Sequence, residues 1–350
     1  MNSDNRNKLE CLIKKHKELG ISEQIDYNKF YLYSIITHST AIEGSTVTEI
    51  EAQLLFDEGI AASKRNITEL NMNLDLKNAY DYGLDWIKKH KDITVEQLIF
   101  LSSKVMSRTG SEYHSIGGTF DSSKGELRKV NVTAGFAGKS YLNYLKVPSK
   151  LQDFCRELNN RRNNIDKTNI SEVYDLSFWA HYELVTIHPW VDGNGRMSRL
   201  LMNLLQFEYN VLPVKILSNE KAEYIQSLID TREKENIEIF ADYMAQIHCK
   251  HLESDINNYV ESISLDVADK TKIVCEMADK WLINPVLADK LADILVFVAD
   301  KPVFSSKEIV SHFGFSETTV RRFLRKLLDL GYIKSQGGNR NRTYMLCCEK

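Results

Sequence analysis

The chain has 350 residues, which is more than one ordinary domain holds and predicts two or three modules. Hydrophobic residues make up 43% and charged residues 27% of it, a balance that excludes a wholly disordered chain. The formal net charge of −3 excludes a general polyanion binder, and no apolar stretch is long enough to predict a membrane span.

The first residues, Met1 to Arg6, are polar and lead into no apolar segment, so we expect no signal peptide. The six cysteines are scattered along the chain and include no CxxC pair. Together with the missing signal, this pattern predicts reduced thiols and a cytoplasmic location.

The composition predicts a mainly helical chain, because it includes only 5 Pro and 16 Gly. A short helix is expected within the first 25 residues, and apolar residues at helical spacing predict a second helix from about Tyr27 to Gly44. Thr46 followed by Glu49 is typical of a capping box that opens a third helix, which ends before Gly59. Two further stretches have helical periodicity, residues 66–90 and 94–107.

The segment 110–147 differs from its flanks, because it contains six of the sixteen glycines. Within it, Arg128–Val132 alternates polar and apolar residues, which predicts loops around a short β-hairpin. Helical patterns resume at 149–160, from about 171 to a glycine-rich turn at 188–196, at 218–232 and at 236–262, with a helical connector over 263–290. The residues after the turn, up to Phe207, are apolar on most sides, which predicts a central, buried helix.

The last sixty residues predict a winged helix-turn-helix. Ser305–Phe313 form its first helix, Ser316 caps the second, and two short strands flank a basic hairpin tip at 337–342. From Lys301 to Lys350, 10 Lys and Arg stand against 4 Asp and Glu, a local charge of +6. Two interpretations stay open: DNA binding, or a module for protein contacts and dimer packing whose charges are merely solvated.

The glycine-rich turn reads His-Pro-Trp-Val-Asp-Gly-Asn-Gly-Arg-Met-Ser-Arg over residues 188–199. Gly193 and Gly195 permit positive φ, so consecutive backbone N–H groups can form an anion-binding nest just before a buried helix. Arg196 and Arg199 share one face of that helix's first turn, where the helix dipole disfavours cations. Their presence there indicates an anionic ligand, and guanidinium groups match phosphate oxygens well.

Two further side chains of the turn suit phosphate chemistry. Asp192 offers a carboxylate for Mg²⁺, which usually takes one or two carboxylates together with substrate phosphates. His188 offers an imidazole that is largely neutral at pH 7 and can accept a proton.

This segment resembles the signature of Fic-domain proteins, His-Pro-Phe-x-Asp-Gly-Asn-Gly-Arg-x-Gly-Arg. Trp190 replaces the Phe and Ser198 the last Gly, and neither change removes a reacting group. The resemblance, which extends over roughly residues 30–250, implies an all-α, Fic-type helical core with a small β-hairpin flap. It also implies transfer of AMP from ATP to a Ser, Thr or Tyr hydroxyl of a target protein.

The resemblance implies a role for each matching residue of the turn. His188 would be the general base on the acceptor hydroxyl, and Asp192 would bind a Mg²⁺ ion that bridges the α- and β-phosphates. Gly193, Asn194 and Gly195 would line the phosphate nest.

Further implied roles concern the arginines and two other segments. Arg196 would support the β-phosphate and Arg199 the γ-phosphate. Tyr224 would lie near the adenine, and Arg128–Val132 lies where the family has its flap, which pairs as a strand with the target's backbone. Two interpretations of Tyr141, farther along, stay open: a self-modification target, or an ordinary surface tyrosine, which we favour.

Upstream, Ser39-Thr-Ala-Ile-Glu43-Gly44 resembles the inhibitory motif of this family, Ser/Thr-x-x-x-Glu-Gly/Asn. Ser39 and Glu43 are four residues apart and share a helix face. The resemblance implies that Glu43 pairs with Arg199, so that this arginine is unavailable for the γ-phosphate and ATP binds in a non-productive pose.

We therefore predict four segments: an N-terminal region with the inhibitory helix (1–60), the catalytic core (61–262), a helical connector (263–290) and the winged helix (291–350). The predicted function is Mg²⁺-dependent adenylyl transfer from ATP to a protein hydroxyl, restrained by Glu43. Two alternatives stay open: transfer of another phosphate-linked group such as UMP or phosphocholine, and a nucleotide-sensing regulator that binds DNA through the winged helix. Relatives in this family often form dimers, so a homodimer is a further expectation, and no membrane partner is expected.

Overall fold

The computed structural model describes residues 1–61, 64–133, 140–281, 283–299, 301, 303–336 and 342–347. Within them the chain divides into two compact units, Met1–Ile256 and Asn257–Lys350. The four narrower segments expected from the sequence stay predictions. Most of the expected hairpin tip, residues 337–341, lies outside the described residues.

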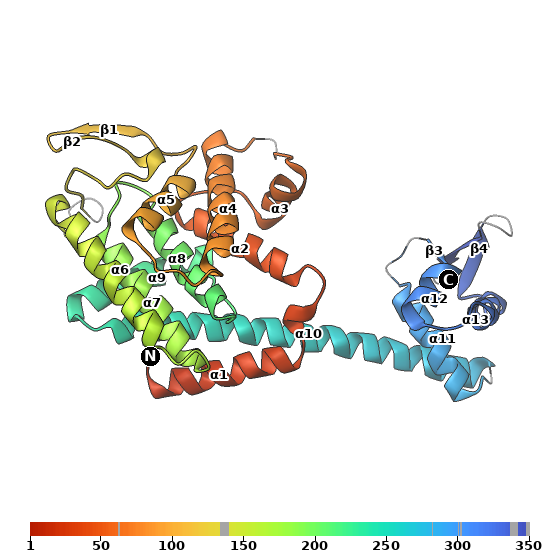
Figure 1. The fold of residues 1–350 in the computed structure, drawn as a ribbon. Coiled ribbons are helices and arrows are strands. Elements are labelled where there is room, and N and C mark those ends of the chain that lie inside the picture. Colours follow the sequence, from red (N-terminus) through yellow and green to blue (C-terminus); the bar gives the residue numbers. More distant parts are fainter. Residues whose placement is uncertain are drawn as a thin grey trace. The chain divides into compact units, whose positions relative to one another are not determined.

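The first unit is mainly α-helical, as the scarcity of Pro and Gly predicts (Figure 1). The helices are α1 (Ser3–Glu18), α2 (Tyr27–Ile42), α3 (Glu49–Glu58), α4 (Ile67–Ile87), α5 (Val95–Val105), α6 (Val147–Asn164), α7 (Ile170–Ile187), α8 (Asn194–Glu208), α9 (Lys221–Lys234) and α10 (Ile237–Trp281), the last of which continues into the second unit. Four short 3-10 helices lie between them: η1 (Ile21–Glu23), η2 (Ser122–Lys124), η3 (Tyr144–Lys146) and η4 (Ser218–Glu220). No helix in the described part of the chain is both long and apolar enough to cross a membrane.

The third helix begins later than the sequence predicts. Thr48, and not Thr46, is its N-cap: the Thr48 hydroxyl accepts from the backbone N–H of Glu51, and the Glu51 carboxylate accepts from the N–H of Thr48. The Thr46 hydroxyl instead donates to Glu69 on α4, at 2.7 Å. Both threonines are followed by a glutamate three residues on, so the sequence alone could not separate the two candidate caps.

The regular β-hairpin also lies outside the segment predicted for it. It is formed by β1 (Glu112–Ser115) and β2 (Gly118–Asp121), which pair antiparallel, whereas Arg128–Val132, all of them described, form no regular strand. The reason is that side chains satisfy the carbonyl groups of this segment: Ser115 donates to Lys129 at 2.9 Å and Arg128 donates to Val130 at 2.8 Å. Directly after this segment, the described residues form an isolated antiparallel bridge between Thr133 and Ser140.

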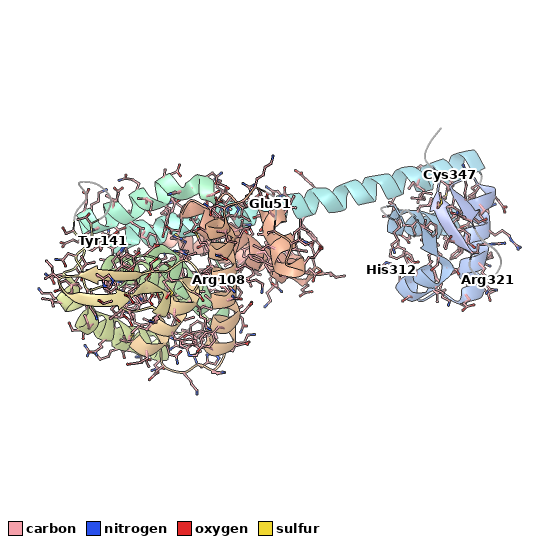
Figure 2. All side chains as sticks on the ribbon, turned by 90° about the horizontal axis from the view of Figure 1, so that it is seen from above. Glu51, Arg108, Tyr141, His312, Arg321 and Cys347 are labelled. Atoms are coloured by element: carbon pink, nitrogen blue, oxygen red, sulfur yellow. The ribbon has the colours of Figure 1, made fainter. Side chains whose placement is uncertain are left out.

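The second unit is a winged helix-turn-helix, as predicted. After the end of α10 it consists of α11 (Pro285–Phe297), β3 (Phe304–Ser305), α12 (Ser306–Phe313), α13 (Glu317–Asp329), β4 (Ile333–Gln336) and β5 (Thr343–Leu346), with the strands in the antiparallel order β3-β5-β4. The predicted cap is confirmed, because the Ser316 hydroxyl accepts from the backbone N–H of Thr319 at 3.2 Å. The apolar face of α13 is buried, and the side chain of Arg321, labelled in Figure 2, is exposed.

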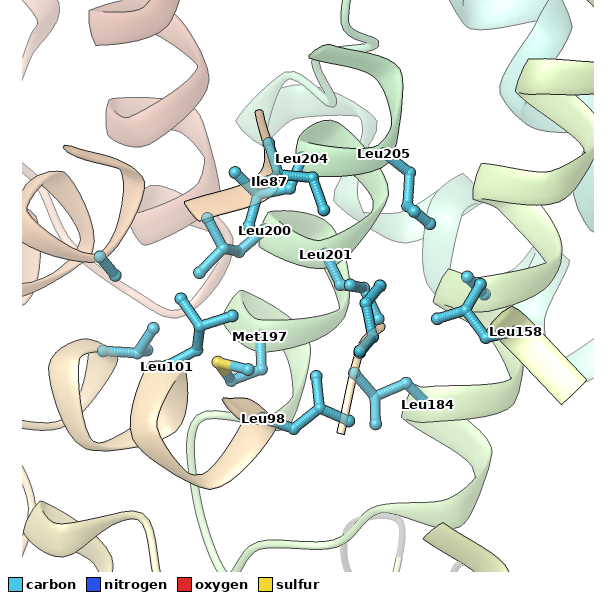
Figure 3. Packing of buried hydrophobic residues seen from close by; sticks show 14 of the residues in the cluster. Ile87, Leu98, Leu101, Leu158, Leu184, Met197, Leu200, Leu201, Leu204 and Leu205 are labelled. Atoms are coloured by element: carbon cyan, nitrogen blue, oxygen red, sulfur yellow. The ribbon is translucent and has the colours of Figure 1, made fainter. Parts of the chain in front are cut away.

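Helix α8 is the central helix of the first unit, as its apolar residues predict. Figure 3 shows four of its leucines among buried side chains of α4, α5, α6 and α7: Leu200, Leu201, Leu204 and Leu205. A Cβ atom at Gly83 on α4 would lie 2.7 Å from a terminal methyl of Leu204, so a larger residue there would require the Leu204 side chain to shift. The core therefore fixes α8 from several sides, and with it the polar residues of its first turn.

Candidate active site

The turn between α7 and α8 is braced by its own side chains. Asn194 accepts from the backbone N–H of Trp190 at 3.0 Å and donates to its carbonyl at 2.8 Å, and the buried Trp190 indole donates to the carbonyl of Gly125 at 2.8 Å. Gly193 has a φ of 80°, and a Cβ there would lie 2.8 Å from the Met106 sulfur. The turn thus needs glycine at this position, and its backbone is held in one shape.

The turn also leaves the N-terminus of α8 free to bind an anion. Gly193 is the N-cap residue and supplies no side-chain hydrogen bond to the N–H groups of the first turn. Such unpaired N–H groups, together with the positive end of the helix dipole, favour a bound phosphate.

His188 ends α7 with a left-handed φ of 52° and is held from three directions. Its backbone N–H donates to Leu184 at 3.1 Å, and its carbonyl accepts from the Arg128 guanidinium at 2.7 Å. Its ring Nδ1 lies 3.3 Å from the carbonyl of Val185. Because a carbonyl can only accept, the hydrogen is on Nδ1 and the lone pair of Nε2 is left for a substrate.

The electrostatic surroundings keep the imidazole of His188 neutral. Burial lowers its pKa to about 4, and the positive charge of Arg128 acts in the same direction. The carboxylates of Asp192 and Glu43 oppose these effects only in part. His188 is therefore unprotonated at neutral pH and able to accept a proton, as the sequence predicts.

Arg199 is buried, and its Nε and Nη2 atoms are hydrogen-bonded to Ser39 and Glu43. Its Nε donates to the Ser39 hydroxyl at 2.8 Å, and its Nη2 donates to the Ser39 carbonyl at 2.9 Å and to the Glu43 carboxylate at 2.6 Å. A Cβ atom at Gly195 would lie 2.5 Å from Oε1 of Glu43. The carboxylate of Glu43 thus lies directly over the first turn of α8, where the sequence places the phosphate nest.

Glu43 is ionised in this position. Burial opposes its negative charge, but the charge of Arg199 and its hydrogen bond, with help from the charge of Arg196, outweigh burial and hold the pKa of Glu43 below its usual range. The side chain keeps 33% of its surface exposed, so solvent can reach it although it pairs with a buried arginine.

Arg196 is buried but poorly satisfied. Its Nη2 lies 3.1 Å from the Met106 sulfur and 3.7 Å from the carboxylate of Asp192, and within the described residues its buried Nε–H has no acceptor. An unpaired buried donor on a guanidinium is costly unless a ligand satisfies it. The residue therefore fits an incoming anion such as a phosphate.

Asp192 fits a magnesium ligand whose other ligands come from a nucleotide. Its side chain is 58% exposed, and Oδ1 accepts from the N–H of Gly193 at 2.6 Å. The described part of the chain offers no group of three or more His, Cys, Asp or Glu side chains that could hold a metal ion alone. A single exposed carboxylate suits Mg²⁺, which usually takes one or two carboxylates plus substrate phosphates.

Tyr224, on α9, lies on the Arg199 side of the site. Its ring is buried, its hydroxyl is 2.9 Å from Nε2 of His181, and the guanidinium carbon of Arg199 is 6.0 Å from the ring centroid. Burial lowers the pKa of His181 to about 3, so this histidine is a neutral partner for the hydroxyl. The contact with adenine stays a prediction.

The role of Arg128, which is 98% buried, was not predicted from the sequence. Besides His188 and Val130, its guanidinium donates to the carbonyl of Leu142 at 2.5 Å, and its backbone N–H donates to Pro189 at 3.0 Å. It thereby ties residues 130 and 142 to the start of the glycine-rich turn. In the sequence it stands between Leu127 and Lys129 like any surface arginine, so no local pattern marks it.

Replacing Arg128 with Met is expected to lower the free energy of unfolding by about 2–4 kcal/mol, because three carbonyl groups lose their donor. Urea unfolding of the first unit measures the loss. Arg156→Met is the matched control, since that side chain is 78% exposed and pairs only with Asp153, and we expect a change within about 0.5 kcal/mol. Equal losses in the two variants would show that the carbonyl groups are simply rehydrated.

Two family models match the chain. Residues 92–206 match the Fic/DOC family, and residues 292–335 match the family described as "Bacterial regulatory protein, arsR family". Among curated relatives, protein adenylyltransferase fic-1 of Caenorhabditis elegans is 26% identical over 233 residues, which covers 66% of this chain and 41% of that protein. Protein adenylyltransferase Fic of Drosophila melanogaster is 29% identical over 203 residues, which covers 55% of this chain and 36% of that protein. The match therefore spans about two fifths of the length of these relatives.

Solved structures show the same fold. A Fic family protein from Desulfovibrio desulfuricans G20 aligns with a TM-score of 0.60 at 17% identity, over 100% of this chain and 98% of that chain. Fic-1 of C. elegans (residues 134–508) aligns with a TM-score of 0.55 at 22% identity, over 75% of this chain and 74% of that chain. The glycine-rich turn, His188 to Arg199, lies inside the range 92–206 that matches the Fic/DOC family model.

Proposed function

Because the chain carries a Fic/DOC-family domain, we propose that it is a protein adenylyltransferase, which transfers AMP from ATP to a Ser, Thr or Tyr hydroxyl of a target protein. The observation that carries this proposal is one braced turn that joins a neutral imidazole, His188, to an uncapped helix N-terminus with two buried arginines. An exposed carboxylate, Asp192, lies between them in the sequence and is our proposed Mg²⁺ ligand.

In the proposed reaction, Nε2 of His188 accepts the proton of the target hydroxyl while its oxygen forms a bond to the α-phosphorus of ATP. The bond from that phosphorus to the bridging oxygen of the β-phosphate breaks, and pyrophosphate leaves. The N–H groups at the start of α8, together with Arg196 and Arg199, stabilise the charge on the departing oxygens. A bound Mg²⁺ would neutralise part of the phosphate charge. The unpaired Nε–H of Arg196 supports this assignment, because a phosphate oxygen would satisfy it.

We further propose that the protein is autoinhibited. The 2.6 Å ion pair with Glu43 occupies Nη2 of Arg199, which the γ-phosphate would otherwise contact. The same carboxylate lies over Gly195, so it also places negative charge beside the phosphate nest. ATP would then bind without its α-phosphorus in line with the acceptor.

Incubation with Mg²⁺ and labelled ATP, with the other nucleotides as competitors, tests the proposal. We expect label from the α-phosphate in protein and no label from the γ-phosphate. UTP or a phosphocholine donor that competes more strongly than ATP would favour transfer of another phosphate-linked group. The cytoplasmic location, the homodimer and the identity of the target protein stay predictions.

The proposed base predicts the pH dependence of transfer. With the pKa of His188 at about 4, the imidazole is unprotonated at higher pH, so kcat/KM is expected to be flat from about pH 6 to 8 and to fall as pH drops toward 4. Initial rates of AMP incorporation across this range measure the profile, with circular dichroism as the control for folding. An acid limb near the ordinary histidine value of about 6.5 would contradict the burial of this imidazole.

A second proposed function is DNA binding by α13. The arsR-family match and the basic residues of this helix favour it: Arg321, Arg322 and Arg325 are exposed, and Lys326 is partly exposed. In such modules the second helix enters the major groove, while basic side chains hold phosphates.

If the four basic residues of α13 each contact a phosphate, DNA binding is expected to weaken about 100-fold between 50 and 200 mM salt. The reason is that each contact releases counterions from the DNA. A mobility-shift titration measures this dependence. The double variant Arg321→Ala/Arg325→Ala should bind more weakly and show a smaller salt slope, whereas Lys14→Ala/Lys17→Ala on α1 is the charge-matched control. Equal binding by both variants would favour a module for protein contacts.

A further inference from the structure

The side chain of Tyr141 covers one face of the imidazole of His188. The two ring centroids are 3.8 Å apart and the ring planes differ by 17°, so the rings are in close, nearly parallel contact. Tyr141 is labelled in Figure 2 and belongs to the segment between the Thr133–Ser140 bridge and η3. It is only partly exposed, and burial raises the pKa of its hydroxyl, so it is not the free surface tyrosine that the sequence suggests.

The backbone on both sides of Tyr141 is held by arginines. Arg232, on α9, donates to the carbonyl of Ser140 at 2.8 Å, and Arg128 donates to the carbonyl of Leu142 at 2.5 Å. The N–H of Tyr141 itself donates to the carbonyl of Val132 at 3.0 Å. The guanidinium carbon of Arg232 also lies 5.4 Å from the centroid of the Tyr141 ring. The ring therefore has a fixed place in the structure.

Arg128 connects this segment directly to the proposed base. The same guanidinium that holds Leu142 also donates to the carbonyl of His188. The backbone of His188 and the backbone next to Tyr141 thus share one buried donor group, and the stacked rings are fixed relative to each other.

The imidazole needs this support, because its one described hydrogen bond is weak. The 3.3 Å separation between Nδ1 and the carbonyl of Val185 is longer than the usual 2.9–3.0 Å for an N–H···O bond. A ring stacked on the face of the imidazole prevents rotation about the Cβ–Cγ bond. It leaves Nε2 open, because the lone pair of Nε2 lies in the ring plane and not on its face.

We propose that Tyr141 is a positioning residue whose ring fixes the plane of the His188 imidazole, so that Nε2 points at the acceptor hydroxyl. The effect on rate rests on the proposed adenylyl transfer. The effect on the imidazole does not, and it can be measured in the protein alone.

Tyr141→Ala is expected to lower kcat about 10- to 100-fold, because a misdirected base loses its near-attack geometry, while KM for ATP stays unchanged. Tyr141→Phe should stay within about twofold of the wild type, since stacking needs the ring and not the hydroxyl. Tyr144→Ala is the matched control, because Tyr144 is a nearby tyrosine at the start of η3 whose ring lies against Gly117.

A titration of the ¹³C-labelled histidine side chains by NMR provides the independent readout, with the His188 signal assigned by its loss in His188→Gln. The signal should titrate near pH 4 in the wild type, Tyr141→Phe and Tyr144→Ala, and clearly higher in Tyr141→Ala, where water reaches the uncovered face. Arg232→Ala keeps the Tyr141 ring but removes the donor that holds the Ser140 carbonyl, so the stacked ring is less firmly held. We expect this variant to raise the pH at which His188 titrates by a smaller amount, and it replaces Tyr141→Ala in the test if that variant does not fold.

An unchanged His188 titration in Tyr141→Ala, or a loss of rate in Tyr141→Phe equal to that in Tyr141→Ala, would overturn the inference. If even the wild type and its Glu43→Gly variant transfer no AMP, the proposed function fails. The titration then decides the role of Tyr141 by itself.

Discussion

Replacing Glu43 with Gly is expected to raise AMP transfer about 10- to 100-fold, because it removes a charge-assisted hydrogen bond of about 1.5–3 kcal/mol that occupies Arg199. The change also removes the carboxylate that lies over Gly195. The γ-phosphate can then pair with the freed Nη2 of Arg199, and the α-phosphorus can align with the acceptor. Self-modification or modification of an added protein with labelled ATP measures the rate, and mass spectrometry identifies the added group as one AMP unit.

Two further variants make this result specific. Glu43→Gln removes the charge and keeps an oxygen that can accept from Arg199, so an intermediate increase is expected. Glu58→Gly places the same substitution at the exposed end of the neighbouring helix α3 and should leave transfer unchanged. Transfer by Glu43→Gly that does not exceed that of the wild type would refute autoinhibition through this contact.

Replacing His188 with Ala in the Glu43→Gly protein is expected to reduce transfer about 10²- to 10⁴-fold, the usual contribution of a positioned general base. ATP binding should persist, because the start of α8 and both arginines remain. Parallel measurements of transfer and of nucleotide affinity by calorimetry separate the two effects.

His114→Ala is the matched control for this variant. His114 lies on β1 with its side chain 75% exposed, so its loss should change neither transfer nor ATP affinity. AMP transfer that survives His188→Ala would show that a group other than His188 accepts the proton. A mobility shift together with a phenotype that survives His188→Ala would instead favour the alternative of a nucleotide-sensing regulator that binds DNA.

The part of the site that the sequence predicts best is the part that is local in the chain. His188 to Arg199 lie within one turn and the start of one helix, so their spacing alone places the imidazole beside an uncapped helix N-terminus. The pairing of Glu43 with Arg199 joins residues 156 positions apart. It was predictable only because Ser39 and Glu43 resemble the inhibitory motif of the family, which implies this pairing.

What the sequence could not predict depends on contacts between distant segments. Arg128 reaches a carbonyl 60 residues away, and nothing in its neighbours shows that its guanidinium is buried. Tyr141 stacks on His188 because Arg128 and Arg232 position its backbone, which again no local pattern records. The position of the hairpin was wrong for a related reason: the side chains of Ser115 and of Arg128 itself occupy carbonyl groups that a strand partner would have used.

The two hydrogen bonds between Ser39 and Arg199 have a consequence for how activity would be switched on. They do not involve Glu43, so they persist when the carboxylate alone turns away, and the guanidinium stays oriented for an incoming nucleotide. If the proposed autoinhibition holds, activation would then need only a rotamer change of the Glu43 side chain and no undocking of a helix. Cutting α2 away would not imitate that change, because the arginine would lose its remaining anchors together with its inhibitor.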